Sequence, residues 1–403
     1  MEIEGQAADP WTMTATDLDR RGRRDPGYSV GIMKRHFPAH LQILVQFSRA
    51  LWFFAIGSLA WRSVSLAQAP VGADAEATAP KLSGYHLAAT WKPGGEGGWD
   101  YLTLDAQGRR LYIARTNRVQ VIDTESGALI GEVPGLDGAH GVALAPEFGR
   151  GFATSGKSGT VTVFDLQSLK PMGAPVTAGK KPDAIAYDAF TKHVFVFNGG
   201  SGDATVIDAQ ESGVIGTVAL GGAPEFGVAD GKGSVLVNLE DKNEVLEIDA
   251  RSLTVKNRWS LAPGESPTGL ALDSVKGRLF SGCRNEKMII LDAVTGKALG
   301  ALPIGKGVDA AVYDAGTGLA FASNGDGTLT VIVESAGKPG EFRVLENVAT
   351  KVGSRTMAID PKTHAIYLAG ADFEPVPPAK AGEPRVRPKM IAGSFVVLKF
   401  EKR

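Results

Sequence analysis

Five residues of types that bind cations recur along the chain at nearly even intervals. They are Asp100, His140, Asp183, Glu225 and Asp309. Each stands at the start of a short apolar run. Consecutive members are about 40 residues apart, except that Glu225 and Asp309 are separated by about twice that distance. Carboxylate oxygens from several segments suit Ca²⁺, Mg²⁺ or Mn²⁺, and an imidazole nitrogen adds Zn²⁺ to these. If the fold brings the five together, they form a site for a divalent cation or another cationic ligand.

The elements that must position these residues come from a sequence repeat. Residues 182–221 hold four short apolar runs with turn residues between them: Ala184–Tyr187, Val194–Phe197, Ala204–Ile207 and Val214–Leu220. Runs this short do not form stable helices, and β-branched and aromatic residues dominate them. The segment is therefore predicted to be a four-stranded antiparallel meander.

Copies of this unit are marked by an aspartate that ends the third strand. In the first five copies it is Asp123, Asp165, Asp208, Asp249 and Asp292, spaced 42, 43, 41 and 43 residues apart. A period of roughly 40–50 residues with four strands per unit is typical of a β-propeller. One such sheet cannot bury both of its faces, whereas blades stacked around an axis can.

The predicted fold is all-β, a seven-bladed β-propeller of four-stranded antiparallel blades over residues 81–403. Blade 7 begins at Thr356 and has three strands before the chain ends. The segment Tyr85–Trp91 precedes blade 1, and we expect it to complete blade 7 and close the ring. Residues 372–393 form a long loop in blade 7, which we expect to fold over one mouth of the channel.

The first 80 residues differ from the repeats. Residues 1–32 are polar, and we expect a disordered extension or an over-extended gene start. Residues 33–69 have the order of a signal peptide: basic residues, the apolar run Ala50–Trp61 and the cleavage pattern Ala67-Gln68-Ala69. Residues 70–80 then form a linker. We expect a periplasmic or secreted monomer with no membrane contact after cleavage.

Composition excludes some functions. The formal net charge is −1, so no nucleic-acid partner is expected. Cys283 is the single cysteine, which excludes an intrachain disulfide. We expect Cys283 to be a small packed residue and the aspartates at strand ends to be turn residues.

Second-strand motifs carry a resemblance to a known family. They are Tyr112-Ile113-Ala114-Arg115, Phe195-Val196-Phe197-Asn198 and Phe321-Ala322-Ser323-Asn324. With the third strands that follow, they resemble the YVTN-repeat β-propellers, a type with WD40-like repeats, and above all the exported YncE-like members. The resemblance covers Tyr85–Phe400 and implies a binding propeller. Its wider superfamily holds propeller subunits of quinoprotein amine dehydrogenases, and metal-dependent propeller lactonases look more distantly alike.

Inner strands of a propeller line its axis, so equivalent positions at their starts should ring one channel mouth. We call this set the axial ring: Asp100, His140, Asp183, Glu225, Thr268, Asp309 and Thr356. Trp99, Phe226 and Arg355 flank it. Crowded carboxylates repel one another unless a cation neutralises them. The ring with its flanking residues is thus a candidate ligand site, and its four carboxylates with His140 are candidate metal ligands. The alternative is that these side chains cap backbone groups of neighbouring blades in a polar channel.

Three functions remain open from the sequence. The first is a binding propeller that takes a small molecule or a protein at the channel mouth. The second is a metal-dependent hydrolase of the lactonase kind, with His140 as ligand or general base. The third is the propeller partner of an amine-dehydrogenase-like redox system, which would need a second chain because this one lacks a haem motif.

Overall fold

The computed structural model describes residues 82–375 and 388–403. The expected extension, signal peptide and linker of residues 1–80 lie outside these residues, as do residues 376–387 of the expected long loop. The propeller lies within the compact unit that ends at Arg403. Within the described ranges, no helix is long and apolar enough to cross a membrane.

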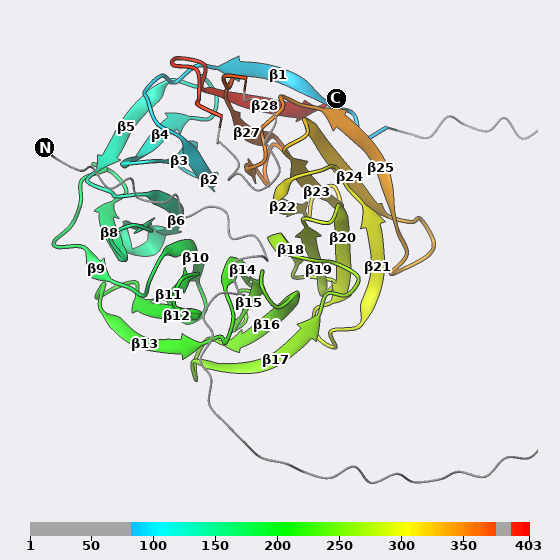
Figure 1. Cartoon of the computed structure of the whole chain (residues 1–403), viewed down its shortest axis with the longest axis horizontal. Coiled ribbons are helices and arrows are strands. Elements are labelled where there is room, and N and C mark those ends of the chain that lie inside the picture. The colour runs from blue at the N-terminus through cyan, green and yellow to red at the C-terminus, as the bar shows by residue number, and fades with distance from the viewer. Residues whose placement is uncertain (1–81, 376–387) are drawn as a thin grey trace, which may run out of the picture. The chain divides into compact units, whose positions relative to one another are not determined.

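The propeller consists of seven four-stranded antiparallel sheets. Figure 1 shows these blades around one axis, with the inner strands near the centre and the outer strands at the circumference. In the described residues the single helical element is the short 3-10 helix η1 (Pro146–Phe148). The predicted fold class is confirmed.

The inner and second strands of the blades define the axis and its surroundings. The inner strands are β2 (Trp99–Asp105), β6 (Ala139–Ala145), β10 (Pro182–Asp188), β14 (Pro224–Ala229), β18 (Pro267–Asp273), β22 (Val308–Asp314) and β26 (Met357–Ile359). The second strands are β3 (Arg110–Arg115), β7 (Arg150–Ser155), β11 (His193–Asn198), β15 (Ser234–Leu239), β19 (Arg278–Cys283), β23 (Leu319–Asn324) and β27 (Ile366–Gly370).

The third and outer strands complete each blade. The third strands are β4 (Arg118–Asp123), β8 (Thr160–Asp165), β12 (Asp203–Asp208), β16 (Glu244–Asp249), β20 (Lys287–Asp292), β24 (Thr328–Glu334) and β28 (Val396–Lys402). The outer strands are β5 (Leu129–Pro134), β9 (Val176–Thr177), β13 (Val214–Ala219), β17 (Thr254–Ser260), β21 (Ala298–Pro303), β25 (Phe342–Ala349) and β1 (Tyr85–Trp91).

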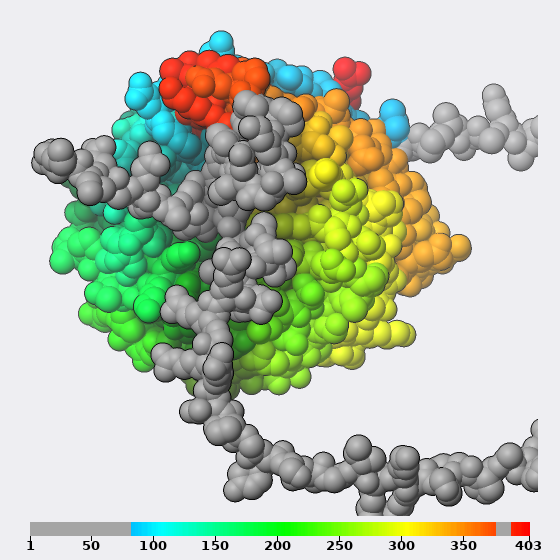
Figure 2. Space-filling view, viewed as in Figure 1, coloured from blue at the N-terminus to red at the C-terminus, as the bar shows by residue number. Residues whose placement is uncertain are grey.

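Strand β1 lies beside the last strand of the chain. It pairs antiparallel with β28, with Tyr85 opposite Lys402 and Trp91 opposite Val397. In the space-filling view the cyan segment of β1 and the red C-terminal segment lie side by side on the rim (Figure 2). The Tyr85 ring contacts Phe321 of blade 6 edge-on at 5.1 Å between ring centres, so β1 touches two blades.

The apolar core is divided among the interfaces between blades. Seven clusters of buried side chains occur, each centred on two neighbouring blades. One contains Val161 of blade 2 with Val194 and Ile207 of blade 3. Burial of both faces of each sheet is what the repeat requires, because an isolated blade would leave these faces in water.

The aspartates at strand ends form local turns, as expected. Oδ1 of Asp123 accepts hydrogen bonds from the backbone N–H groups of Glu125 and Ser126 and from the Ser126 hydroxyl. These bonds, led by the one from the Ser126 backbone, lower the pKa of Asp123 to about 2. Such residues terminate strands and need no ligand.

Candidate functional site

In blades 1 to 6 the axial ring residues lie in β-bulges. In blade 3, Pro182 is opposite Asn198 and Ile185 is opposite Val196, so β10 carries one extra residue between these pairs. The same shift occurs in β2, β6, β14, β18 and β22. A bulge changes the direction of the side chains in it. The six ring residues are second in their strands rather than first, and Thr356 comes just before β26.

Three of the five expected cation ligands come together. Nδ1 of His140 lies 2.6 Å from Oδ2 of Asp100 and 3.7 Å from Oδ1 of Asp183. One ligand atom from each residue lies within 4.8 Å of the others, and we call this group the Asp–His–Asp cluster. In the described chain, Glu225 and Asp309 are outside that group. The structure therefore divides the five candidate metal ligands of the axial ring into a cluster of three and two residues outside it.

The Asp–His–Asp cluster is largely shielded from water. The side chains of Asp100 and His140 are 9% and 8% exposed, and that of Asp183 is 17% exposed. Gly156, just after β7, makes room for the imidazole, because a Cβ there would lie 2.5 Å from Nε2 of His140. Any larger residue at position 156 would displace the imidazole ring of His140.

Burial and charge shift the pKa values in this cluster. Burial lowers the pKa of His140, but the hydrogen bond to Asp100 and the charges of Asp183 and Asp100 outweigh it, so the pKa is raised overall. Burial raises the pKa of Asp183 to about 7, opposed by His140 and reinforced by Asp100 and Asp309. Oδ1 of Asp183 is buried and accepts no hydrogen bond from the described residues.

The other two ring carboxylates differ from each other. Oδ2 of Asp309 pairs with Nε of Arg355 at 2.8 Å, which confirms that Arg355 stands beside the ring. The pKa of Asp309 is raised by burial, although Arg355 opposes this. Burial, with the charge of Asp183, raises the pKa of Glu225 well above its ordinary value. Glu225 has no hydrogen-bonded or ion-paired partner among the described residues.

Sequence analysis missed three residues at this mouth. Tyr101 follows Asp100 and is buried; its ring contacts Phe226 of blade 4 edge-on at 5.3 Å between ring centres. A side chain of blade 1 thus reaches across to blade 4. Glu240 and Arg284 follow second strands and pair at 3.2 Å. Both act on the ring, since Glu240 raises and Arg284 lowers the pKa of Glu225.

The expected backbone caps occur on hydroxyl residues rather than on the carboxylates. Oγ1 of Thr268 donates to the carbonyl of Val308 in the next blade at 3.0 Å, and Oγ1 of Thr154 donates to that of Asp183 at 2.7 Å. No backbone N–H of the described chain donates to the side chains of Asp100, Asp183, Glu225 or Asp309. The carboxylates therefore do not replace ladder hydrogen bonds.

Trp99 serves the interface between blades 7 and 1. Its ring centre lies 5.5 Å from that of Phe395 and 6.1 Å from that of Phe373. Phe373 forms an isolated bridge with Met390, at the described base of the expected long loop. Trp99 therefore connects that base to Asp100, and its contacts are apolar.

The remaining reactive side chains have structural surroundings. Cys283 is fully buried, and burial raises the pKa of its thiol to about 12. Nδ1 of His193 lies 3.0 Å from the carbonyl of Ala250. His364 lies 2.9 Å from Oδ2 of Asp314, at the other end of β22 from the ring. None of these side chains adds to the axial ring.

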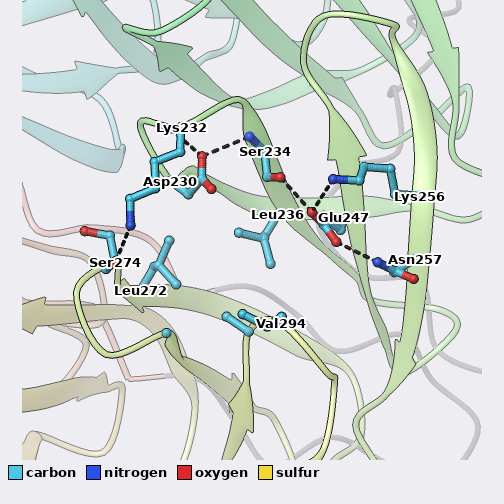
Figure 3. A pocket seen from close by; sticks show the side chains of 12 residues that line it. Asp230, Lys232, Ser234, Leu236, Glu247, Lys256, Asn257, Leu272, Ser274 and Val294 are labelled. Carbon is cyan, nitrogen blue, oxygen red and sulfur yellow. Dashed lines mark hydrogen bonds and ion pairs between the residues drawn. The ribbon is translucent and has the colours of Figure 1, made fainter.

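A groove of about 380 Å³ lies between blades 4 and 5. Figure 3 shows Leu236 and Leu272 in it, with Glu247 bonded to Ser234, Lys256 and Asn257. These hydrogen bonds overcome the effect of burial and lower the pKa of Glu247. The carboxylate of Glu247 in this groove therefore has hydrogen-bond partners, unlike the carboxylate of Glu225 in the axial ring.

Comparisons with known proteins find the fold and no family. No protein-family model matches the sequence, and no curated protein matches it either. A chain of Kuenenia stuttgartiensis hydrazine synthase matches with a TM-score of 0.59 at 15% identity, over 67% of this chain and 92% of that one. A chain of a mitotic checkpoint complex matches with a TM-score of 0.63 at 14% identity, over 88% and 99%.

These similarities support a β-propeller of WD40-like architecture and nothing finer. The identities are too low to transfer an activity, and 1801 chains of solved structures match this chain. Because the fold alone does not select a function, the function must be inferred from the chemistry of the site.

Proposed function

We propose that this protein is an exported binding protein of the YVTN-repeat type, with its ligand site at the axial ring. The repeat motifs and the N-terminal order of basic, apolar and small residues support this assignment. Location in the periplasm or outside the cell is part of the proposal. N-terminal sequencing of the exported protein tests it, with Pro70 expected as the first residue; recovery of residues 1–69 would contradict it.

The ligand class we propose is a cation. The observation that carries this is the crowding of Asp183 and Glu225, two partly buried carboxylates whose pKa values are raised by burial and by neighbouring acids. No backbone donor of the described chain stabilises their charge. A bound positive charge would offset both the cost of burying these carboxylates and their mutual repulsion.

The ligand takes one of two forms in this proposal. It is a small cation, or a Lys or Arg side chain that a partner protein inserts into the mouth. Propellers matched here occur in a checkpoint complex, so a protein ligand agrees with how this fold is used elsewhere. Tyr101 contacts Phe226 and lies close enough to the ring for the charges of Glu225, Asp183, Asp100 and Asp309 to act on its hydroxyl.

A second candidate function is metal-dependent hydrolysis. The observation favouring it is the 2.6 Å contact between His140 and Asp100, which orients the imidazole as in acid–base catalysis. No comparable observation in the described residues favours a redox partner role. Hydrolysis of lactone or ester substrates by the wild type, lost in His140→Gln, would establish this second function.

Thermal shift tests the binding proposal. The purified chain is titrated with putrescine, spermidine, divalent cations and lysine-containing peptides, and compared with Glu225→Gln and with Glu211→Gln. Glu211 is exposed in the turn before β13, so Glu211→Gln removes the same charge outside the ring. We expect a saturable rise in Tm for wild type and Glu211→Gln that is weakened in Glu225→Gln. No response to any probe, or a response to the amines and lysine-containing peptides that is equal in all three, would overturn the proposal.

A further inference from the structure

We propose that Asp100, His140 and Asp183 form a binding site for a divalent transition-metal ion, Zn²⁺ or Mn²⁺. The inference rests on the proposed role of the axial ring in cation binding, and it narrows that role to three residues and one ligand class. It leaves Glu225 and Asp309 outside the metal's immediate ligands. The five-residue metal set expected from the sequence is therefore reduced to the residues that lie together.

The distances within the Asp–His–Asp cluster suit such an ion. In tetrahedral geometry, a metal held about 2.0–2.2 Å from each ligand atom places those atoms about 3.3–3.6 Å apart. The observed separations from Nδ1 of His140, 2.6 Å and 3.7 Å, lie on either side of that range. Small side-chain rotations therefore suffice, and the backbone positions are set by three neighbouring inner strands, β2, β6 and β10.

A second observation points to a ligand at the same place. Oδ1 of Asp183 is buried, lies 3.7 Å from the imidazole nitrogen and accepts no hydrogen bond from the described chain. A buried carboxylate oxygen without a donor is destabilising unless something positive meets it. A cation between Asp183 and His140 would supply that contact, whereas the interior of the groove between blades 4 and 5 shows no such unmet group.

The donor set selects among metals. Ca²⁺ takes six to eight oxygen ligands, whereas one imidazole nitrogen with two carboxylates suits Zn²⁺ or Mn²⁺. On binding, the proton on Nδ1 leaves to solvent and the freed lone pair is donated to the metal, so the contact with Asp100 passes through the ion. Three protein ligands leave at least one coordination position for water or a ligand.

The test measures binding of the metals alone. The chain is stripped with chelator and dialysed, and Zn²⁺, Mn²⁺ and Ca²⁺ are titrated into wild type, Asp183→Asn and His140→Gln. Asp309→Asn and Glu225→Gln are the matched controls, since each removes a ring carboxylate outside the cluster. Binding is followed by Tm, by elemental analysis and by the visible absorption of Co²⁺, which reports ligand type without relying on stability.

We expect one ion per chain, with Zn²⁺ or Mn²⁺ binding more tightly than Ca²⁺. Binding should weaken at least tenfold in Asp183→Asn and His140→Gln and stay within about threefold in Asp309→Asn, and the Co²⁺ spectrum should change in His140→Gln. If Asp309→Asn or Glu225→Gln abolishes binding while Asp183→Asn keeps it, the cluster is wrong and the cationic ring stands. If only organic cations bind, the metal inference fails alone; if no cation binds, both proposals fail.

Discussion

Replacing Arg115 by Met tests how the chain holds the approach to the axial ring. Arg115 ends β3, is fully buried, and its guanidinium carbon lies 3.7 Å from the centre of the Phe395 ring. It donates hydrogen bonds to the carbonyls of residues 94–98 and to Oε1 of Gln120. Burial lowers its pKa to about 10, so it stays charged at neutral pH. The segment it holds leads directly into Asp100.

The magnitude follows from these bonds. The two shortest, to the carbonyl of Gly97 and to Gln120, are 2.8 Å long. A hydrogen bond from a charged group contributes about 1.5–3 kcal/mol. The four longer bonds reach an exposed loop, where water can replace them, and Met keeps much of the contact with Phe395. We expect Arg115→Met to lower the free energy of unfolding by about 3–5 kcal/mol, and Tm by roughly 5–8 °C.

Calorimetry at one scan rate measures the effect, with Arg109→Met as the control. Arg109 is 60% exposed and pairs with Asp123 and Glu125. Exposed pairs contribute about 0–1 kcal/mol, so Arg109→Met should melt within about 2 °C of wild type. Arg115→Met should also be cut faster at Glu96 by a glutamyl endopeptidase. Equal melting of both variants with unchanged cleavage would refute the role assigned to Arg115.

Four further predictions follow from the described contacts. Measured with chelator, Glu225→Gln should be more stable than wild type by a margin that grows as the pH rises above the pKa of an unfolded glutamate, about 4.3. The raised pKa makes the native wild type hold a proton that the unfolded chain releases above about pH 4.3, so wild type loses stability as pH rises; a margin independent of pH contradicts this. Tyr101→Ala should lose about 3–5 kcal/mol through its contact with Phe226 and Tyr101→Phe less than about 1 kcal/mol, and equal losses would assign the effect to the hydroxyl. Cys283 should resist a disulfide reagent in the native state and react after denaturation, since it is buried with a pKa of about 12; rapid native reaction would refute that. Deleting residues 82–92 should abolish cooperative unfolding if β1 closes the ring, and an unchanged Tm would show that it does not.

The fold could be predicted because its signals are local. Each aspartate of the repeat forms hydrogen bonds within its own turn, as Asp123 does with Ser126. The spacing of these aspartates along the chain therefore does not depend on contacts with other blades. Alternating apolar runs then follow from burial of both sheet faces. The strand starts differ from the expected ones by one residue, because β2, β6, β10, β14, β18 and β22 each begin one residue before the ring residue and β26 begins one residue after Thr356. The role of β1 depends on a partner at the opposite end of the chain, which a local pattern does not carry.

The site could be predicted only as a set of equivalent positions. The repeat identified the axial ring, but how its members pair depends on the bulges and on what faces each one across the axis. One signal for the missed Tyr101 was present. The position after the ring residue is small in four blades and aromatic in two, as shown by Gly141, Ala184, Gly269 and Ala310 against Tyr101 and Phe226. Two large side chains among small ones indicate a contact across the axis.

The pairing of charges makes the axial ring unequal around its circumference. Beyond blade 4, Arg284 of blade 5 pairs with Glu240 of blade 4, and Arg355 pairs with Asp309 of blade 6. On the side of blades 1 to 4, Asp100 and Asp183 share one imidazole, and Glu225 has no partner in the described residues. An added cation is therefore favoured beside Asp183, and it is opposed near Arg355, where like charges would meet. This asymmetry favours one cation bound at a defined position over counterions loosely associated with the whole ring.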